Sequence, residues 1–84
     1  MDINKIKQAL TKQLKFDEII INGDGRHFKI IAVCEIFNGM SQVQRQQIIY
    51  EPLMEYITDN CIHSLSIRAY THSEWIKYSN INNF

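Results

Sequence analysis

The segment IHSLSIRAY, from Ile62 to Tyr70, decides the fold, because it is a strand-like run that follows two predicted helices. It leads into THSEW, where Thr71 and Glu74 have the spacing of a capping box and predict a short last helix through Trp75 and Ile76. A strand that two helices separate from the preceding strand is expected to lie parallel to a neighbour, with a right-handed crossover.

One helix and two strands are predicted at the start of the chain. The helix is expected over about Ile3 to Lys15, because an aspartate caps it and its apolar residues fall on one stripe at helical spacing. The β-branched run in Glu18 to Asn22 predicts a strand. The turn Gly23-Asp24-Gly25 then leads into a second strand, from about His27 to Ile36. Because this strand is apolar on both sides, it is expected to be the central one.

Two helices are predicted between the second and third strands. Ser41 is a suitable N-cap for a helix from Gln42 to about Tyr50. Pro52 interrupts a continuous helix but is accepted in the first turn of a new one, which would run to Asp59. Asn60 is a plausible left-handed cap for its end. The residues of this helix expected to face inward are Leu53, Met54 and Ile57.

The predicted order is α-β-β-α-α-β-α. It corresponds to an α+β fold with a three-stranded mixed sheet and helices packed on one face. The chain has 84 residues and is too short to build two cores, so residues 1–84 are expected to form a single domain. Residues 79–84 are polar and are expected to be a loose tail.

The charge balance argues against broad electrostatic attraction to nucleic acid or to an anionic membrane. The chain has nine Lys and Arg residues and nine Asp and Glu residues, so its formal net charge is +0. No apolar run approaches the roughly 20 residues needed to cross a bilayer, and the N-terminal residues lack a signal pattern. A cytoplasmic protein is therefore expected, with Cys34 and Cys61 reduced, since they form no Cys-x-x-Cys pair.

His63, at the mouth of the third strand, is the main candidate for chemistry. An imidazole held on a rigid strand near solvent suits metal ligation or proton transfer, and the alternative is a partly buried histidine with one hydrogen bond at a strand edge. His27, just after the glycine turn, is either a solvent-facing hairpin residue or a partner of His63, if their strands are neighbours about 4.8 Å apart. Cys61 shares a face with His63 in an extended chain, so it is either a third ligand or a small apolar plug. Cys34 is expected in the core, and His72 on the surface.

Short motifs that together span nearly the whole chain resemble the BolA family. They are Gly23-Asp24-Gly25-x-His27-Phe28, Phe37-x-Gly39-Met40-Ser41, Gln46-Gln47, Pro52-Leu53, Ile62-His63-Ser64-Leu65-Ser66-Ile67 and Tyr70-Thr71-x-x-Glu74-Trp75. The combined pattern is specific, and it is most similar to the short acid-stress subgroup of the family. The resemblance implies an αββααβ core related to class II KH domains, with a short C-terminal helix.

The resemblance also implies a partner and a cofactor. BolA-like proteins bind monothiol glutaredoxins and share a bridged [2Fe-2S] cluster with them; the family's ligand histidine falls on His63, and the second ligand position falls on His27. A [2Fe-2S] cluster needs four ligands, and this chain offers two, or three with Cys61. The others would be the glutaredoxin cysteine and a glutathione thiolate. The chain would then be a monomer alone and a heterodimer with its partner, in iron–sulfur trafficking or iron sensing.

No catalytic motif is present, so an enzyme is not expected. The alternative function is a KH-like DNA- or RNA-binding transcriptional regulator linked to acid stress, with a patch of Arg45, Arg68, Lys29 and Lys77 as the candidate contacts. KH domains clamp the nucleic-acid backbone with a Gly-x-x-Gly loop, whereas the matching helix junction here is Ile49-Tyr50-Glu51-Pro52. Classical BolA proteins carry Arg-His-Arg in the second helix, where this chain has Gln44-Arg45-Gln46, a departure that argues against a DNA-binding role of that helix here.

Overall fold

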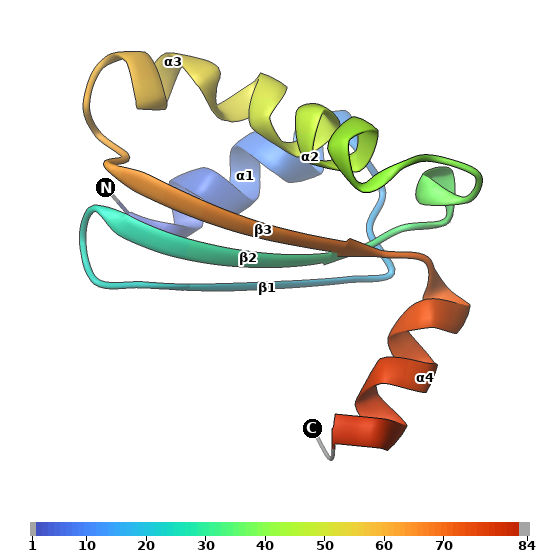
Figure 1. The fold of residues 1–84 in the computed structure, drawn as a ribbon. Helices are drawn as coiled ribbons and strands as arrows, with labels where there is room; N and C mark the ends of the chain where they lie inside the picture. Colours follow the sequence, from blue (N-terminus) through green and yellow to red (C-terminus); the bar gives the residue numbers. More distant parts are fainter. Residues whose placement is uncertain (1, 83–84) are drawn as a thin grey trace.

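The computed structural model describes residues 2–82, in which helices lie on both sides of a three-stranded sheet (Figure 1). The strands have the spatial order β1-β2-β3. In chain order, the elements are α1 (Ile3–Gln13), β1 (Glu18–Gly23), β2 (His27–Val33), a 3-10 turn (Glu35–Phe37), α2 (Gln42–Tyr50), a second 3-10 turn (Glu51–Leu53), α3 (Met54–Thr58), β3 (Ser64–Tyr70) and α4 (His72–Asn82). None of the helices in the described residues is long and apolar enough to cross a membrane.

The sheet is mixed, and β2 is its central strand, as the sequence predicts. β1 runs antiparallel to β2, with Glu18 opposite Val33. β3 runs parallel to β2, with His27 opposite Ser64 and Val33 opposite Tyr70. The predicted parallel crossover through two helices is therefore confirmed, and the first residues of β2 and β3 meet at one end of the sheet.

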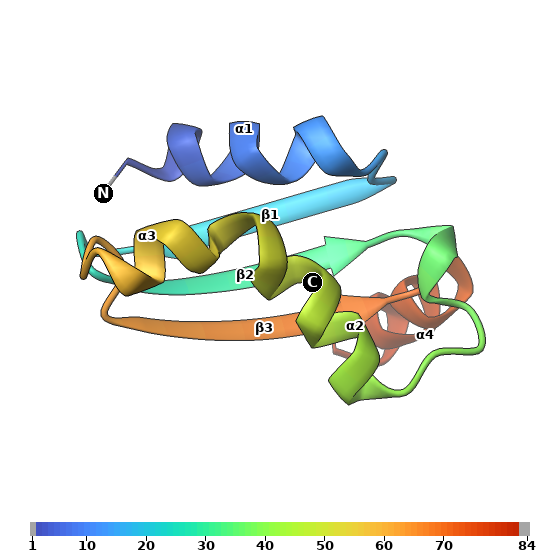
Figure 2. The ribbon, with the colours of Figure 1, turned by 90° about the horizontal axis from the view of Figure 1, so that it is seen from above.

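One face of the sheet carries the hydrophobic core under α1, α2 and α3. Figure 2 shows α1 along the β1 side, α3 over β1 and β2, and α2 crossing β2 and β3. Alternate residues of a strand point to opposite faces, and the buried set follows that rule. The core residues that the strands and helices contribute are Phe28, Ile30 and Ala32 from β2, Ile67 and Ala69 from β3, Ile6 and Leu10 from α1, Ile49 from α2, and Leu53 before α3.

The last helix differs from its prediction in length and position. α4 continues to Asn82, so the loose tail expected from residue 79 is helical as far as that residue, while residues 83–84 lie outside the described part of the chain. It also lies on the side of the sheet away from the other three helices (Figure 1), whereas all helices were expected on one face. The cause is aromatic packing: the Tyr70 ring centroid lies 5.6 Å from that of Trp75 and 5.2 Å from that of Tyr78. Trp75 Nε1 also donates a hydrogen bond to Glu18, 2.9 Å away.

Several predicted boundaries are wrong, because local turns replace regular structure. β2 ends at Val33, and residues 35–37 form the 3-10 turn, so Cys34 lies beyond the strand although it is buried as expected. α1 ends at Gln13, and the third strand begins at Ser64. Met54 was expected to face inward but is 51% exposed. The 3-10 turn before it winds more tightly than an α-helix, and there it is Leu53 that is buried.

The predicted caps are confirmed. The Ser41 side chain accepts a hydrogen bond from Gln44 N, and the Gln44 side chain accepts one from Ser41 N, so α2 begins with a capping box. Thr71 and Glu74 do the same for α4, with hydrogen bonds of 3.3 Å and 2.8 Å. Asn60 has a φ of 61°, the left-handed conformation expected after α3.

Arg45 joins α2, β3 and α4 through its guanidinium group, which is buried. Its Nη1 donates to the carbonyl of Ala69 at 3.1 Å and to Glu74 at 2.6 Å, and its Nε donates to the carbonyl of Met40 at 3.2 Å. The hydrogen bond from Arg45 and that from the Thr71 amide lower the pKa of Glu74 from 4.5 to about 2. The ionised Glu74 therefore holds α4 to the rest of the fold.

We predict that Glu74→Gln lowers the free energy of unfolding at pH 7 by about 1–3 kcal/mol, because Arg45 stays buried without its counter-charge. The native pKa of Glu74 lies below its ordinary value. Its ionised form therefore stabilises the fold above about pH 4.5, and this stabilisation is lost as the pH falls towards 2. The difference between the two proteins should shrink over that range in urea titrations. Glu55→Gln, at an exposed carboxylate of α3, is the control and should have little effect. A difference that is the same at pH 7 and pH 2 would contradict the assignment.

Candidate metal centre

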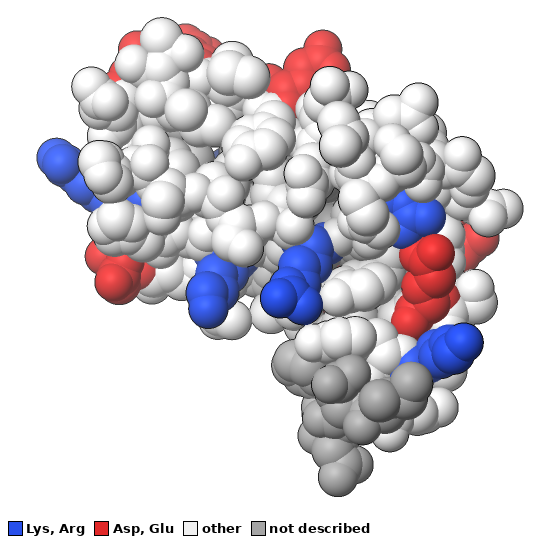
Figure 3. Space-filling model, viewed as in Figure 1, with Lys and Arg blue, Asp and Glu red and all other residues white. Residues whose placement is uncertain are grey.

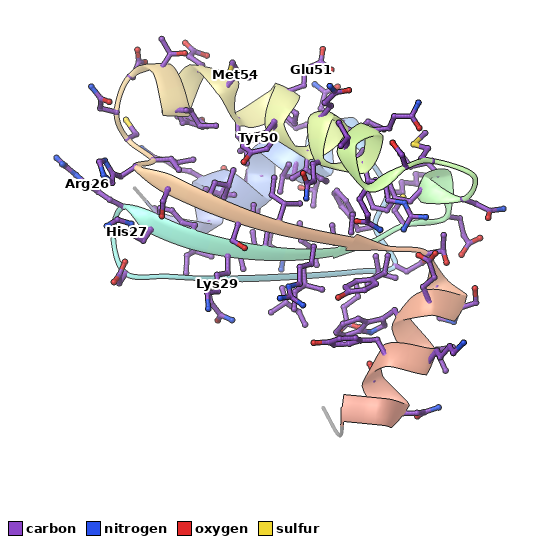
Figure 4. The ribbon with its side chains drawn as sticks, in the orientation of Figure 1. Arg26, His27, Lys29, Tyr50, Glu51 and Met54 are labelled. Atoms are coloured by element: carbon purple, nitrogen blue, oxygen red, sulfur yellow. The ribbon has the colours of Figure 1, made fainter. Side chains whose placement is uncertain are left out.

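The start of β2 and the residue before β3 bring His27 and His63 together. Their ring centroids are 5.2 Å apart, and the ring planes are nearly perpendicular, at 82°. Backbone hydrogen bonds fix this approach, because the carbonyl of Arg26 accepts from His63 N at 2.8 Å and from Ser64 N at 3.2 Å. Figure 4 shows His27 at the end of β2 remote from α4. The hairpin therefore brings His27 close to His63. The sequence had left this possibility open beside that of a solvent-facing hairpin residue.

The His27 ring has a second contact that orients it. Its Nδ1 lies 2.8 Å from the Ser64 hydroxyl. When Nδ1–H donates to this oxygen, the lone pair of Nε2 is left for a metal, and such a contact is the usual way in which a ligand imidazole is fixed in one tautomer. Sequence analysis missed Ser64, because the contact follows from the register of β2 against β3.

The His63 ring is open to solvent. Within residues 2–82 its two nitrogens have no hydrogen-bond partner, and its one ring contact is with His27. The reading of His63 as a partly buried residue with a hydrogen bond at a strand edge is therefore wrong. Two exposed imidazoles on neighbouring strands form a pair that a metal centre can approach from solvent.

The two cysteines do not join this pair. Cys61 is exposed, which excludes the apolar-plug reading, and its Sγ lies 4.0 Å from the carbonyl of Asp59. No set of three or more His, Cys, Asp or Glu side chains in the described residues is placed to hold a metal ion, so Cys61 does not complete a three-ligand set here. Cys34 is buried near the first helix, with its Sγ 3.2 Å from the carbonyl of Lys15.

His72 lies far from the pair, on the first turn of α4. Its backbone N–H donates to Glu35 at 3.0 Å, and its side chain is exposed, as the sequence indicated. The chain therefore places its third histidine at the other end of the sheet from His27 and His63.

The residues proposed for nucleic-acid contact do not form one patch. Arg45 is buried and paired with Glu74, so it is not available to a phosphate, and this part of the prediction is wrong. Lys29 and Arg68 are exposed on the face of the sheet away from α2. At the junction of α2 and α3, Tyr50 turns towards the sheet and donates to the carbonyl of Leu65 at 3.3 Å, while Glu51 points outward (Figure 4).

Comparison with known proteins places this geometry in a family. The model of the BolA-like protein family matches residues 5–74. The acid stress protein IbaG of Escherichia coli is 50% identical over 84 residues, which cover 100% of both chains. Among solved structures, a bolA protein homologue from Coxiella burnetii matches with a TM-score of 0.77 and 30% identity over 90% of this chain and 97% of that one. The BolA domain of SufE1 from Arabidopsis thaliana matches with a TM-score of 0.77 and 27% identity. The match covers 88% of this chain and 98% of that one.

This protein therefore belongs to the BolA family. Its full-length identity with IbaG places it in the IbaG-like subgroup, as the sequence motifs indicated.

We predict that Ser64→Ala allows the His27 ring to exchange between its two neutral tautomers, because His27 Nδ1 loses its 2.8 Å contact with the Ser64 hydroxyl. The ¹⁵N chemical shifts of the His27 ring should move towards those of the exposed His72, which long-range ¹H–¹⁵N spectra at pH 8 can measure. Ser66→Ala, on the same face of β3, is the control and should leave these shifts in place. Unchanged His27 shifts in the Ser64 variant would contradict the contact.

Proposed function

We propose that this protein binds a monothiol glutaredoxin and that the two share a [2Fe-2S] cluster, to which this chain contributes His63 and His27. The observation that carries the proposal is the pair of exposed imidazoles, 5.2 Å apart, at one end of the β2–β3 ladder. Membership of the BolA family is consistent with it.

The donor set fits such a cluster. Histidine nitrogens replace thiolates on one iron of Rieske-type [2Fe-2S] centres, so imidazole is a competent ligand for this group. The rings lie nearly perpendicular. The exposed His63 side chain, which has no hydrogen bond within residues 2–82, can rotate to direct a nitrogen towards a cluster that His27 also binds. Two imidazoles leave two ligand positions to fill, which the glutaredoxin cysteine and a glutathione thiolate would occupy.

The chain's own residues prepare the site. The backbone contacts of Arg26 hold the two histidines at neighbouring strand ends, and Ser64 orients the His27 ring. These contacts are present without a partner, so association would require little reorganisation of the backbone. The cluster, when bound, supplies iron and sulfide that can be moved between proteins or sensed.

The biological role that follows is binding rather than turnover. A protein that contributes half of a ligand set holds a cluster only while its partner is present, which suits trafficking or iron sensing. We propose that the chain is monomeric alone, forms a heterodimer with the glutaredoxin, and acts in the cytoplasm.

We predict that His63→Ala removes the contribution of this chain to the cluster. Mixing the protein with a monothiol glutaredoxin that holds a cluster should change its visible absorption and circular dichroism spectra, and His63→Ala should abolish the change. His27→Ala should weaken cluster-dependent association by at least about 10–100-fold, the loss typical even for residues that only support a metal ligand.

His72→Ala is the matched control, because His72 is an exposed histidine on α4 away from the pair. Its spectra and affinity should equal those of the natural protein. If His63→Ala behaves like His72→Ala, the ligand assignment is wrong.

A further inference from the structure

The face of the sheet away from α1, α2 and α3 is a second candidate binding surface. The middle of this face, which we call the open face, consists of Ile20 and Asn22 of β1, Lys29 and Ile31 of β2, and Ser66 and Arg68 of β3. α4 projects from this side at one end of the sheet (Figure 1). The open face with Tyr78 of α4 encloses a depression of about 300 Å³.

Two cations on the open face lack counter-charges. Lys29 and Arg68 are exposed, and within residues 2–82 neither forms an ion pair or a side-chain hydrogen bond. Figure 3 shows two basic side chains side by side on the underside of the sheet, with no acidic side chain between them. Figure 4 shows Lys29 pointing away from the helices. Because unpaired cations on a concave surface attract anions, the open face favours an anionic ligand.

The cations and the apolar residues lie at successive levels along the strands. Lys29 is opposite Ser66 and Arg68 is opposite Ile31, two residues further on. Two residues further again is Tyr70, on whose ring Tyr78 packs. One step of two residues in an extended chain spans about 6.6 Å. The levels are therefore positive, positive and aromatic, at the spacing of alternate residues in an extended peptide.

The order of charged and aromatic levels indicates which kind of ligand fits the open face. Two cations match two carboxylates, and the half-buried rings of Tyr70 and Tyr78 at the third level match one apolar side chain. A nucleic acid carries a phosphate at every nucleotide and is held by many cations, whereas Arg45 is buried and this face has two. We infer that the open face binds an extended acidic segment of a protein partner, with the pattern acidic-x-acidic-x-apolar. His27 lies on the same face, two residues before Lys29, but neither histidine is among the contacts proposed for the peptide, so this binding can be tested without the cluster.

The test uses a fluorescein-labelled peptide, Ser-Glu-Ser-Glu-Ser-Phe-Ser, with the full-length protein. Each surface ion pair contributes little to the free energy of binding, so the complex is expected to be weak and is measured at low salt. Fluorescence anisotropy and ¹H–¹⁵N spectra follow the titration up to about 2 mM peptide, a range that covers weak complexes. We expect the amide signals of Lys29, Ile31 and Arg68 to shift, and the affinity to fall as ionic strength rises.

Two changes should remove this binding. Lys29→Gln combined with Arg68→Gln should weaken it at least tenfold, and so should a peptide with Gln at both Glu positions. Lys12→Glu, at an exposed lysine of α1, is the control and should bind the acidic peptide as the natural protein does. His63→Ala should also bind it normally, which separates this test from that of the cluster.

Three outcomes would overturn the inference. One is the absence of shifts on the open face at about 2 mM peptide, where millimolar complexes are detected. Another is equal binding of the Gln peptide, or of the Lys29 and Arg68 double variant. The third is a single-stranded oligonucleotide of matched length that binds this face while the acidic peptide does not, which would assign the surface to nucleic acid.

Discussion

The register of the parallel β2–β3 ladder determines where the exposed groups of both candidate surfaces lie. Because His27 lies opposite Ser64, the two histidine rings meet at one end, and Lys29 and Arg68 become diagonal neighbours on the open face. The same register keeps Leu65, Ile67 and Ala69 under the helices. A slip of one residue would reverse the faces of β3. Burial of the core therefore fixes the position of every exposed group that we consider functional.

Helix α2 covers the outer edge of β3 and so helps to keep its register. Three of its side chains donate to successive carbonyls on the outer edge of β3: Arg45 to Ala69, Gln46 to Ile67 and Tyr50 to Leu65. An uncovered edge strand invites pairing with another chain, and these contacts occupy the acceptors that such pairing would use. Arg45 also reaches Glu74, so the same helix holds the start of α4. Both the histidine pair and the open face stay accessible in this arrangement.

Local signals in the sequence predicted most of the fold. The caps at Ser41 and at Thr71, the break at Pro52 and the left-handed Asn60 depend on neighbouring residues, and all four were predicted correctly. The length and side of α4 depend on the packing of Trp75 and Tyr78 against Tyr70 and on the hydrogen bond from Trp75 to Glu18. The burial of Arg45 depends on Glu74, which is distant in sequence. The site divides in the same way. His63 and His27 were candidates because of their positions at strand starts and the resemblance to the BolA family, but the Ser64 contact and the separation of Cys61 follow from tertiary geometry.

In the proposed complex, two imidazoles of this chain would bind one shared cluster. This arrangement is tested most directly by pulsed electron paramagnetic resonance of the reduced complex, with this chain labelled with ¹⁵N at histidine and the glutaredoxin unlabelled. We expect two ¹⁵N nuclei strongly coupled to the cluster, which fall to one when His27 is replaced and to none when His63 is replaced. A spectrum without ¹⁵N coupling, or one with a single coupled nitrogen in the natural protein, would contradict it.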